Sequence, residues 1–308
     1  MTRAVMVLSE NWTLVSPRDL RGLVELAVSA ERAGVHTVML SEHVVLGPSA
    51  GAAGRMANPR ESAAPGNQDP ALPWPDSIVL AAAIAAATSE LRIALAAIIA
   101  PLRHPLLLAK QLATLDLLAE GRLVVQPTVS WAAEEYAALD VPFSSRGAIL
   151  DEQLEAMHAA WSDTPAAFAG EHFRFADVYC EPKPHRPDGP AMWFGGRTLH
   201  PALRRRIVRY GSGFHPFGTP TDADVEHLAG AMAAAGRDIA ELELVGGIRG
   251  RFSGATDVAD LDEALADVAD LIGRGFTSIC FKPAMFTDDR DAVPDVCRRV
   301  VECLAGAS

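Results

Sequence analysis

The chain lacks a long apolar segment. No run of about 18 apolar residues is free of charges, so the sequence predicts no transmembrane helix. It also lacks positive charge in excess: the net charge of the 308 residues is −12, which disfavours a nucleic acid or an anionic membrane as a partner. The amino terminus has no signal-peptide pattern. We therefore expect a cytoplasmic protein that acts on a small molecule.

Cysteine is scarce, and several catalytic motifs are missing. The chain has four cysteines and no C-x-x-C pair, as is typical of small core residues in a reducing cytoplasm. No H-x-H or H-E-x-x-H spacing occurs, so we predict no metal site. A Ser-His-Asp order, a nucleophile elbow and a P-loop are also absent.

Strand-like and helix-like segments alternate along the chain. An apolar run at 92–99 predicts a strand buried on both faces, helical spacing follows at 105–119, and a second buried strand begins at Leu123. Such a unit connects parallel strands. Eight strands, each followed by a helix, predict an α/β protein with a (β/α)8 TIM barrel fold in one domain, residues 1–308. An open doubly wound sheet is the alternative, but its G-x-G-x-x-G turn is absent.

One long segment, from about 44 to 76, has no clear period and is rich in Gly, Pro, Ala and Asn. Loops of this length within a compact domain are usually functional lids or disordered. We interpret this insertion as a lid that covers a ligand site.

Glu42 and His43 follow the second predicted strand, and strand ends line the ligand site of a barrel. A neighbouring carboxylate can tune a histidine for proton transfer. We therefore predict that both residues are catalytic. Of two adjacent strand-end residues, one faces the barrel axis and the other faces the helices. The alternative for either residue is that it only braces the following loop.

A second group of candidates follows the later strands. Gly195 and Gly196 precede a predicted helix, and their backbone N–H groups could approach a phosphate with which Arg197 pairs. Glycines also serve tight turns, which is the alternative. The other expected cofactor contacts at strand ends are Ala96, Ala97, Thr128, Ser130, Thr198 and His215. We assign Trp12 and Trp131 to the substrate pocket.

Three segments carry a resemblance to a known family. They are RHPLLLAKQLATLDLLAEGRL before a closing tryptophan, the stretch 134–161 that begins EEYAALDVPF, and EPKPHRPDGPAMWFGG at 181–196. The chain resembles the bacterial luciferase-like monooxygenase superfamily of flavin- or deazaflavin-dependent oxidoreductases. The resemblance implies a (β/α)8 barrel with the cofactor ring at its C-terminal mouth, and often a homodimer.

The resemblance also assigns roles to single positions. Glu42-His43 is similar to the acidic residue and histidine that end strand two in deazaflavin-using members. Ala96-Ala97 matches a strand-three bulge with a non-prolyl cis bond that backs the ring. Gly195 and Gly196 match the phosphate-holding loop.

The chain departs from the family at the end of strand four. The usual glycine-rich ending G-x-G-x-G-W is replaced by Gln126-Pro127-Thr128-Val129-Ser130-Trp131. A glutamate that donates a proton in the sugar-phosphate dehydrogenase branch aligns with Trp131, and a tryptophan of that branch aligns with Gly47. These departures disfavour glucose 6-phosphate as the substrate.

The main hypothesis is an oxidoreductase that uses coenzyme F420 for hydride transfer with a small organic substrate. The first alternative is an FMN-dependent monooxygenase, supplied by a flavin reductase, that uses reduced flavin and oxygen. The second is a non-catalytic protein that binds a flavin or deazaflavin. A sugar-phosphate barrel enzyme without a redox cofactor is a weaker alternative, because only Lys183 and Lys282 lie near predicted strand ends.

Overall fold

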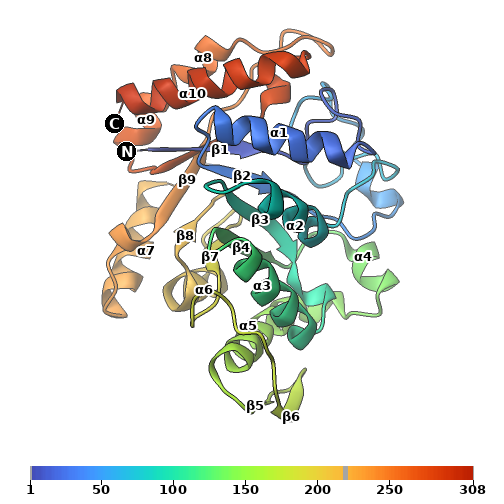
Figure 1. Ribbon diagram of the computed structural model, residues 1–308, viewed down its shortest axis with the longest axis vertical. Coiled ribbons are helices and arrows are strands. Elements are labelled where there is room, and N and C mark those ends of the chain that lie inside the picture. The colour runs from blue at the N-terminus through green and yellow to red at the C-terminus, as the bar shows by residue number, and fades with distance from the viewer. Residues whose placement is uncertain (1, 218–220, 308) are drawn as a thin grey trace.

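A closed barrel of eight parallel strands forms the centre of the molecule (Figure 1). The computed structural model describes residues 2–217 and 221–307. The barrel strands run in the order β1-β10-β9-β8-β7-β4-β3-β2 and close on themselves, which confirms the predicted (β/α)8 barrel. Their bounds are β1 Arg3–Val7, β2 Thr37–Leu40, β3 Arg92–Ile99, β4 Leu123–Thr128, β7 Ala191–Phe194, β8 Gly213–Phe214, β9 Glu243–Gly247 and β10 Ser278–Phe281.

Helices surround the barrel, and their apolar faces pack on the strands. The long ones are α1 Leu20–Arg32, α2 Ser77–Ala87, α3 Pro105–Leu118, α5 Arg146–Ser162, α6 Pro201–Tyr210, α7 Asp222–Ala234 and α10 Val293–Ala307. A short helix, α4 Ala133–Ala138, follows β4. The apolar spacing of 258–272 predicts one amphipathic helix, but the structure has two, α8 Leu261–Leu265 and α9 Val268–Gly273. The first begins late because Asp260 caps it, accepting N–H groups of Asp262 and Glu263.

Strand β3 has a bulge at its C-terminal end. Ala96 pairs with Gln126 whereas Ile98 pairs with Pro127, so Ala97 is the extra residue. The peptide bond between Ala96 and Ala97 is cis, as the resemblance predicts. The bulge turns a short backbone segment with small side chains toward the barrel mouth.

A two-stranded hairpin lies outside the barrel. It consists of β5 Ala166–Ala169 and β6 Arg174–Val178, and it projects beyond α5 at the bottom of Figure 1. Alternation in the sequence predicts this hairpin at 170–182, a few residues too late. The turn of the hairpin packs on the start of α3, where the ring centroids of His104 and Phe173 lie 5.6 Å apart.

The segment 44–76 is anchored across the barrel mouth. The Nδ2 group of Asn58 donates to the carbonyls of Gly254 (3.0 Å) and Asp257 (2.8 Å), beyond β9. The guanidinium of Arg60 pairs with Asp288, beyond β10. The middle of this segment is therefore tied to the loops that follow β9 and β10. Within the described ranges, no helix is long and apolar enough to cross a membrane.

Candidate active site

A cavity of about 1050 Å³ opens at the C-terminal ends of the barrel strands, beneath the segment 44–76. This volume suits a ligand as large as a flavin-type cofactor with a substrate. The predicted site residues that line it are Glu42, His43, Ala96, Ala97, Thr128, Ser130, Trp131, Arg197 and His215. Trp12, Gly195, Gly196 and Thr198 are not part of its lining. Most of the strand-end candidates therefore share one cavity.

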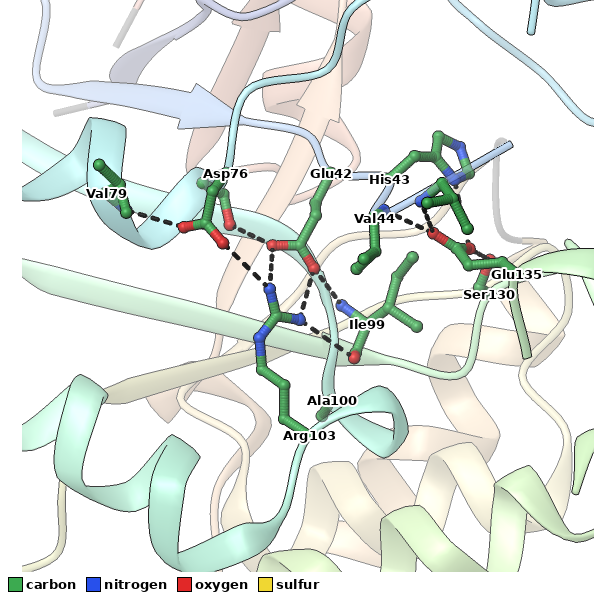
Figure 2. Close-up of polar contacts among 12 residues, drawn as sticks. Glu42, His43, Val44, Asp76, Val79, Ile99, Ala100, Arg103, Ser130 and Glu135 are labelled. Carbon is green, nitrogen blue, oxygen red and sulfur yellow. Dashed lines mark hydrogen bonds and ion pairs between the residues drawn. The ribbon is translucent and has the colours of Figure 1, made fainter. Parts of the chain in front are cut away.

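His43 contacts a carboxylate that is distant in the sequence. Its Nδ1 lies 3.4 Å from Oε2 of Glu135 in α4, and the side chains of His43 and Glu135 are 9% and 0% exposed. Glu135 also accepts the N–H groups of Val44 (2.6 Å) and Val45 (3.3 Å) and the hydroxyl of Ser130 (3.3 Å). The carboxylate thus orients the imidazole and holds the start of the 44–76 segment (Figure 2).

Glu42 points away from His43, toward Arg103 (Figure 2). Its two oxygens accept from Nη1 and Nη2 of Arg103 at 2.8 and 2.9 Å, and also from the hydroxyl of Ser77 (2.6 Å) and the N–H of Ile99 (3.1 Å). The expectation that Glu42 tunes His43 therefore needs correction: the carboxylate at His43 is Glu135. Adjacent residues at a strand end face opposite sides, so Glu42 points away from the imidazole of His43. Its hydrogen bonds instead join the ends of β2 and β3 to the start of α2.

Aromatic rings surround His43. Its ring centroid lies 5.2 Å from that of Trp74 and 5.6 Å from that of Trp131, both nearly perpendicular. Trp12 lies behind Trp74, with centroids 5.3 Å apart. Trp131 thus flanks the candidate catalytic histidine, and Trp12 lies outside the cavity lining but packs on Trp74, which is part of it. Trp74 comes from the aperiodic 44–76 segment, where strand-end reasoning offers no signal.

The predicted phosphate loop is tightly packed against β8. A Cβ added to Gly195 would lie 2.0 Å from the carbonyl oxygen of His215, so only glycine fits there. Nδ1 of His215 lies 2.9 Å from Oε1 of Gln126, and burial lowers the pKa of His215 to about 4. His215 is therefore neutral near pH 7 and carries no positive charge for a phosphate.

Two arginines supply positive charge to this side of the cavity. Arg197 follows β7, and Arg249 follows β9; both line the cavity and are exposed. Neither has an acidic partner within the part of the chain that the structure describes. Arg249 was not predicted, although it lies two residues after a barrel strand. Thr198 is exposed beside this loop, and His200 caps the helix α6 that follows.

The strand next to β9 carries a buried cation that the sequence did not single out as a site. Lys282, directly after β10, is 2% exposed; its Nζ donates to the Glu61 carbonyl (2.8 Å) and lies 3.9 Å from Oε2 of Glu10. Its position directly after a predicted strand is the pattern in the sequence that indicates a place in the cavity wall. Among the residues that the structure covers, no group of three or more His, Cys, Asp or Glu side chains is arranged to hold a metal.

Comparison with known proteins gives one family. The profile of the luciferase-like monooxygenase family matches residues 1–285. An uncharacterized protein of Mycobacterium tuberculosis is 32% identical over 231 residues, which cover 71% of this chain and 77% of the relative. An FMNH2-dependent dimethylsulfone monooxygenase of Pseudomonas putida is 29% identical over 53% of this chain and 46% of that enzyme.

Solved structures show the same fold. A monooxygenase of Streptomyces bottropensis matches with a TM-score of 0.74 and 19% identity, over 99% of both chains. The coenzyme F420-dependent tetrahydromethanopterin reductase of Methanopyrus kandleri matches with a TM-score of 0.71 and 12% identity, over 98% of both chains. Among these relatives and structures, one is therefore named for FMNH2 and one for coenzyme F420.

Proposed function

The chain belongs to the luciferase-like monooxygenase family of flavin- or F420-dependent oxidoreductases, and we propose that it uses coenzyme F420 for hydride transfer with a small organic substrate. The observation that carries this proposal is the position of His43. It lines the cavity at the barrel mouth, and its Nδ1 contacts the buried Glu135. A histidine held in this way can take or give a proton at its other ring nitrogen.

The residues present fit such a cofactor. Ala96 and Ala97 leave one cavity wall with little side chain, which suits a flat ring system. Arg197 and Arg249 place two guanidinium groups at the mouth of a chain whose net charge is −12, and these suit a phosphate or other anionic part of the cofactor. When bound, F420 supplies the two-electron chemistry, and the protein supplies orientation and electrostatics.

The protein contributes proton handling and exclusion of water. With a hydrogen on Nδ1 directed at Glu135, Nε2 of His43 is left as a proton acceptor for a substrate hydroxyl. In the reverse direction, protonated His43 donates to the oxygen of a carbonyl. The anchored segment 44–76 covers the cavity and shields the reacting groups from water.

The FMN-dependent monooxygenase remains the second candidate, because the dimethylsulfone monooxygenase among the relatives is named for FMNH2. It would require a flavin reductase as a partner. Titration of the purified protein with each cofactor, followed by tryptophan fluorescence, separates the two. We expect F420 to bind at micromolar concentration and FMN to bind more weakly. Tight binding of FMN without binding of F420 would overturn our proposal in favour of the monooxygenase.

The non-catalytic alternative is tested by turnover. We expect F420-dependent reduction of at least one compound in a panel of ketones and enones, and we expect His43→Ala to abolish it while F420 binding is retained. Binding without turnover across the panel would favour a cofactor-binding protein instead.

We also infer a homodimer in a reducing compartment. Val79 on α2 is 70% exposed, and Leu107 and Leu118 on α3 are 54% and 46% exposed, so neighbouring helices present apolar side chains outward. The four cysteines are unpaired, which supports the cytoplasm. Light scattering of wild type and Val79→Glu tests the dimer: a monomeric wild type would contradict it.

A further inference from the structure

The buried ammonium of Lys282 has no assigned role in the proposed reaction. It lines the same cavity as His43, and its Nζ lies 5.4 Å from the ring centroid of Trp12. Burial lowers the pKa of Lys282, while Glu10 and Glu61 act against this shift. A buried amine on a cavity wall is costly unless its N–H groups are used. One of its three N–H groups goes to the Glu61 carbonyl.

The charges around Lys282 exclude an anion as its ligand. Glu10 lies 3.9 Å away, and its oxygens accept from the Ser41 hydroxyl (2.6 Å) and the Ala63 N–H (3.1 Å). Glu61 also lines the cavity. Two carboxylates thus face one ammonium, and the local net charge is not positive. An uncharged oxygen can accept an N–H group here, whereas a carboxylate or phosphate is repelled.

A second donor lines the same cavity as this ammonium, with the ring of Trp12 between them. The indole Nε1 of Trp74 is buried and has no hydrogen-bond partner among residues 2–217 and 221–307, and the same holds for Oε1 of Gln68. Both side chains line the cavity. Buried polar atoms normally have partners, and these two lack one among the described residues. A ligand in the cavity that reached them would supply it. The rings of Trp12, Trp74 and His43 form a row that leads from Lys282 to the candidate catalytic histidine.

We propose that Lys282 and Trp74 form a subsite for the oxygen of an uncharged, ring-containing carbonyl compound. The flat aromatic row favours a ring, the two N–H groups favour a carbonyl oxygen, and Glu10 with Glu61 disfavours an acid. This inference deepens the proposed function by naming its substrate class. It concerns binding, so it does not depend on which cofactor the enzyme uses.

Three probes on the purified full-length protein test the subsite by tryptophan fluorescence: 1-tetralone, the hydrocarbon tetralin, and 1-naphthoate. We expect 1-tetralone to bind about tenfold more tightly than either of the others, as one charge-assisted hydrogen bond implies. Lys282→Met should raise the Kd of 1-tetralone about tenfold and remove this preference. Lys183→Met is the matched control, because Lys183 also donates to backbone carbonyls, those of Ala160 and Asp163, but lies outside the cavity lining.

Glu10→Gln provides an independent test, because it removes one negative charge and leaves the ammonium in place. We expect this variant to gain affinity for 1-naphthoate by about tenfold. Unchanged binding of 1-tetralone in a folded Lys282→Met protein would overturn the subsite, and so would the absence of saturable 1-tetralone binding to wild type. Melting temperatures establish that each variant is folded. A failed F420 titration leaves these binding results unaffected, so the two proposals fail separately.

Discussion

Two buried glutamates flank the start of the segment 44–76, and they differ in the charge of their partners. Glu42 pairs with the guanidinium of Arg103, whereas Glu135 accepts neutral N–H and O–H groups and contacts the imidazole of His43. The charge of Glu42 is therefore neutralised by a permanent cation. Glu135 has no arginine or lysine partner in the described part of the chain, and the imidazole of His43 is a cation beside it only when protonated. Although both carboxylates are buried, Glu42 therefore has a structural role, whereas Glu135 can act on His43.

The largest expected effect is on stability, from Glu42→Gln. Loss of this carboxylate leaves Arg103, whose side chain is 12% exposed, without its main partner. Removing one member of a buried pair typically costs about 3–5 kcal/mol of the free energy of unfolding. Urea denaturation measures this loss. Glu25→Gln is the control, because Glu25 is 71% exposed in its pair with Arg290 and should cost less than about 1 kcal/mol. Equal effects in the two variants would contradict the distinction between buried and exposed pairs.

Glu135→Gln should affect turnover more than folding. The amide can present an N–H group to Nδ1 of His43 and so select the wrong tautomer, and we expect kcat to fall about a hundredfold. F420 affinity should be unchanged, and Glu135→Asp should restore part of the activity. In a His43→Ala background, the same substitution should have little further effect, since the two residues act as a unit. A full additional hundredfold loss there would show that Glu135 does not act through His43.

His215 also lies at the barrel mouth, but its hydrogen-bond partner is the neutral amide of Gln126, whereas that of His43 is the carboxylate of Glu135. The pKa of His215, about 4 in the folded protein, is below its unfolded value. The unfolded chain therefore binds the proton first, and stability falls as the pH drops through about 6.5 toward 4. Between pH 7.5 and 5, we expect a loss of about 2 kcal/mol from this residue.

His215→Gln should remove this share of the acid sensitivity in urea denaturation. His36, whose pKa burial also lowers to about 4, contributes in the same direction and remains in that variant. An equally steep pH dependence in wild type and His215→Gln would contradict the assignment.

The smallest expected effect is at Ser130, which hydrogen-bonds to Glu135 and has a φ of 55°. This left-handed conformation favours glycine. Both Ser130→Gly and Ser130→Ala lose the hydroxyl, but only alanine retains the strain. We expect the glycine variant to be more stable than the alanine variant by about 1 kcal/mol. Thermal unfolding measures the difference, and the opposite order would contradict the strain at this position.

The sequence alone predicted the barrel and the end of it at which the site lies. The apolar run at 92–99 and the capped helical pattern at 105–118 are local patterns, and each predicts the strand or helix in which it lies. Residues within three positions after a strand, among them His43 and Arg197, could therefore be placed at the mouth from strand ends alone. The cis bond at Ala96-Ala97 followed from the family resemblance. Trp74 could be named from the sequence as a wall of a flat apolar pocket, but its contact with His43 could not be predicted, because an aperiodic segment carries no period from which to read its direction.

Only the tertiary structure decided which carboxylate serves His43. Glu42 is adjacent in sequence, but neighbouring residues at a strand end face opposite sides, and its charge is taken by Arg103, 61 residues away. Glu135 is 92 residues from His43 and reaches it because α4 packs against the start of the 44–76 segment. Local patterns determine where strands and helices form, since they depend on neighbouring residues. Partners of buried charges depend on the closure of the whole barrel, and the sequence carries no local signal for them.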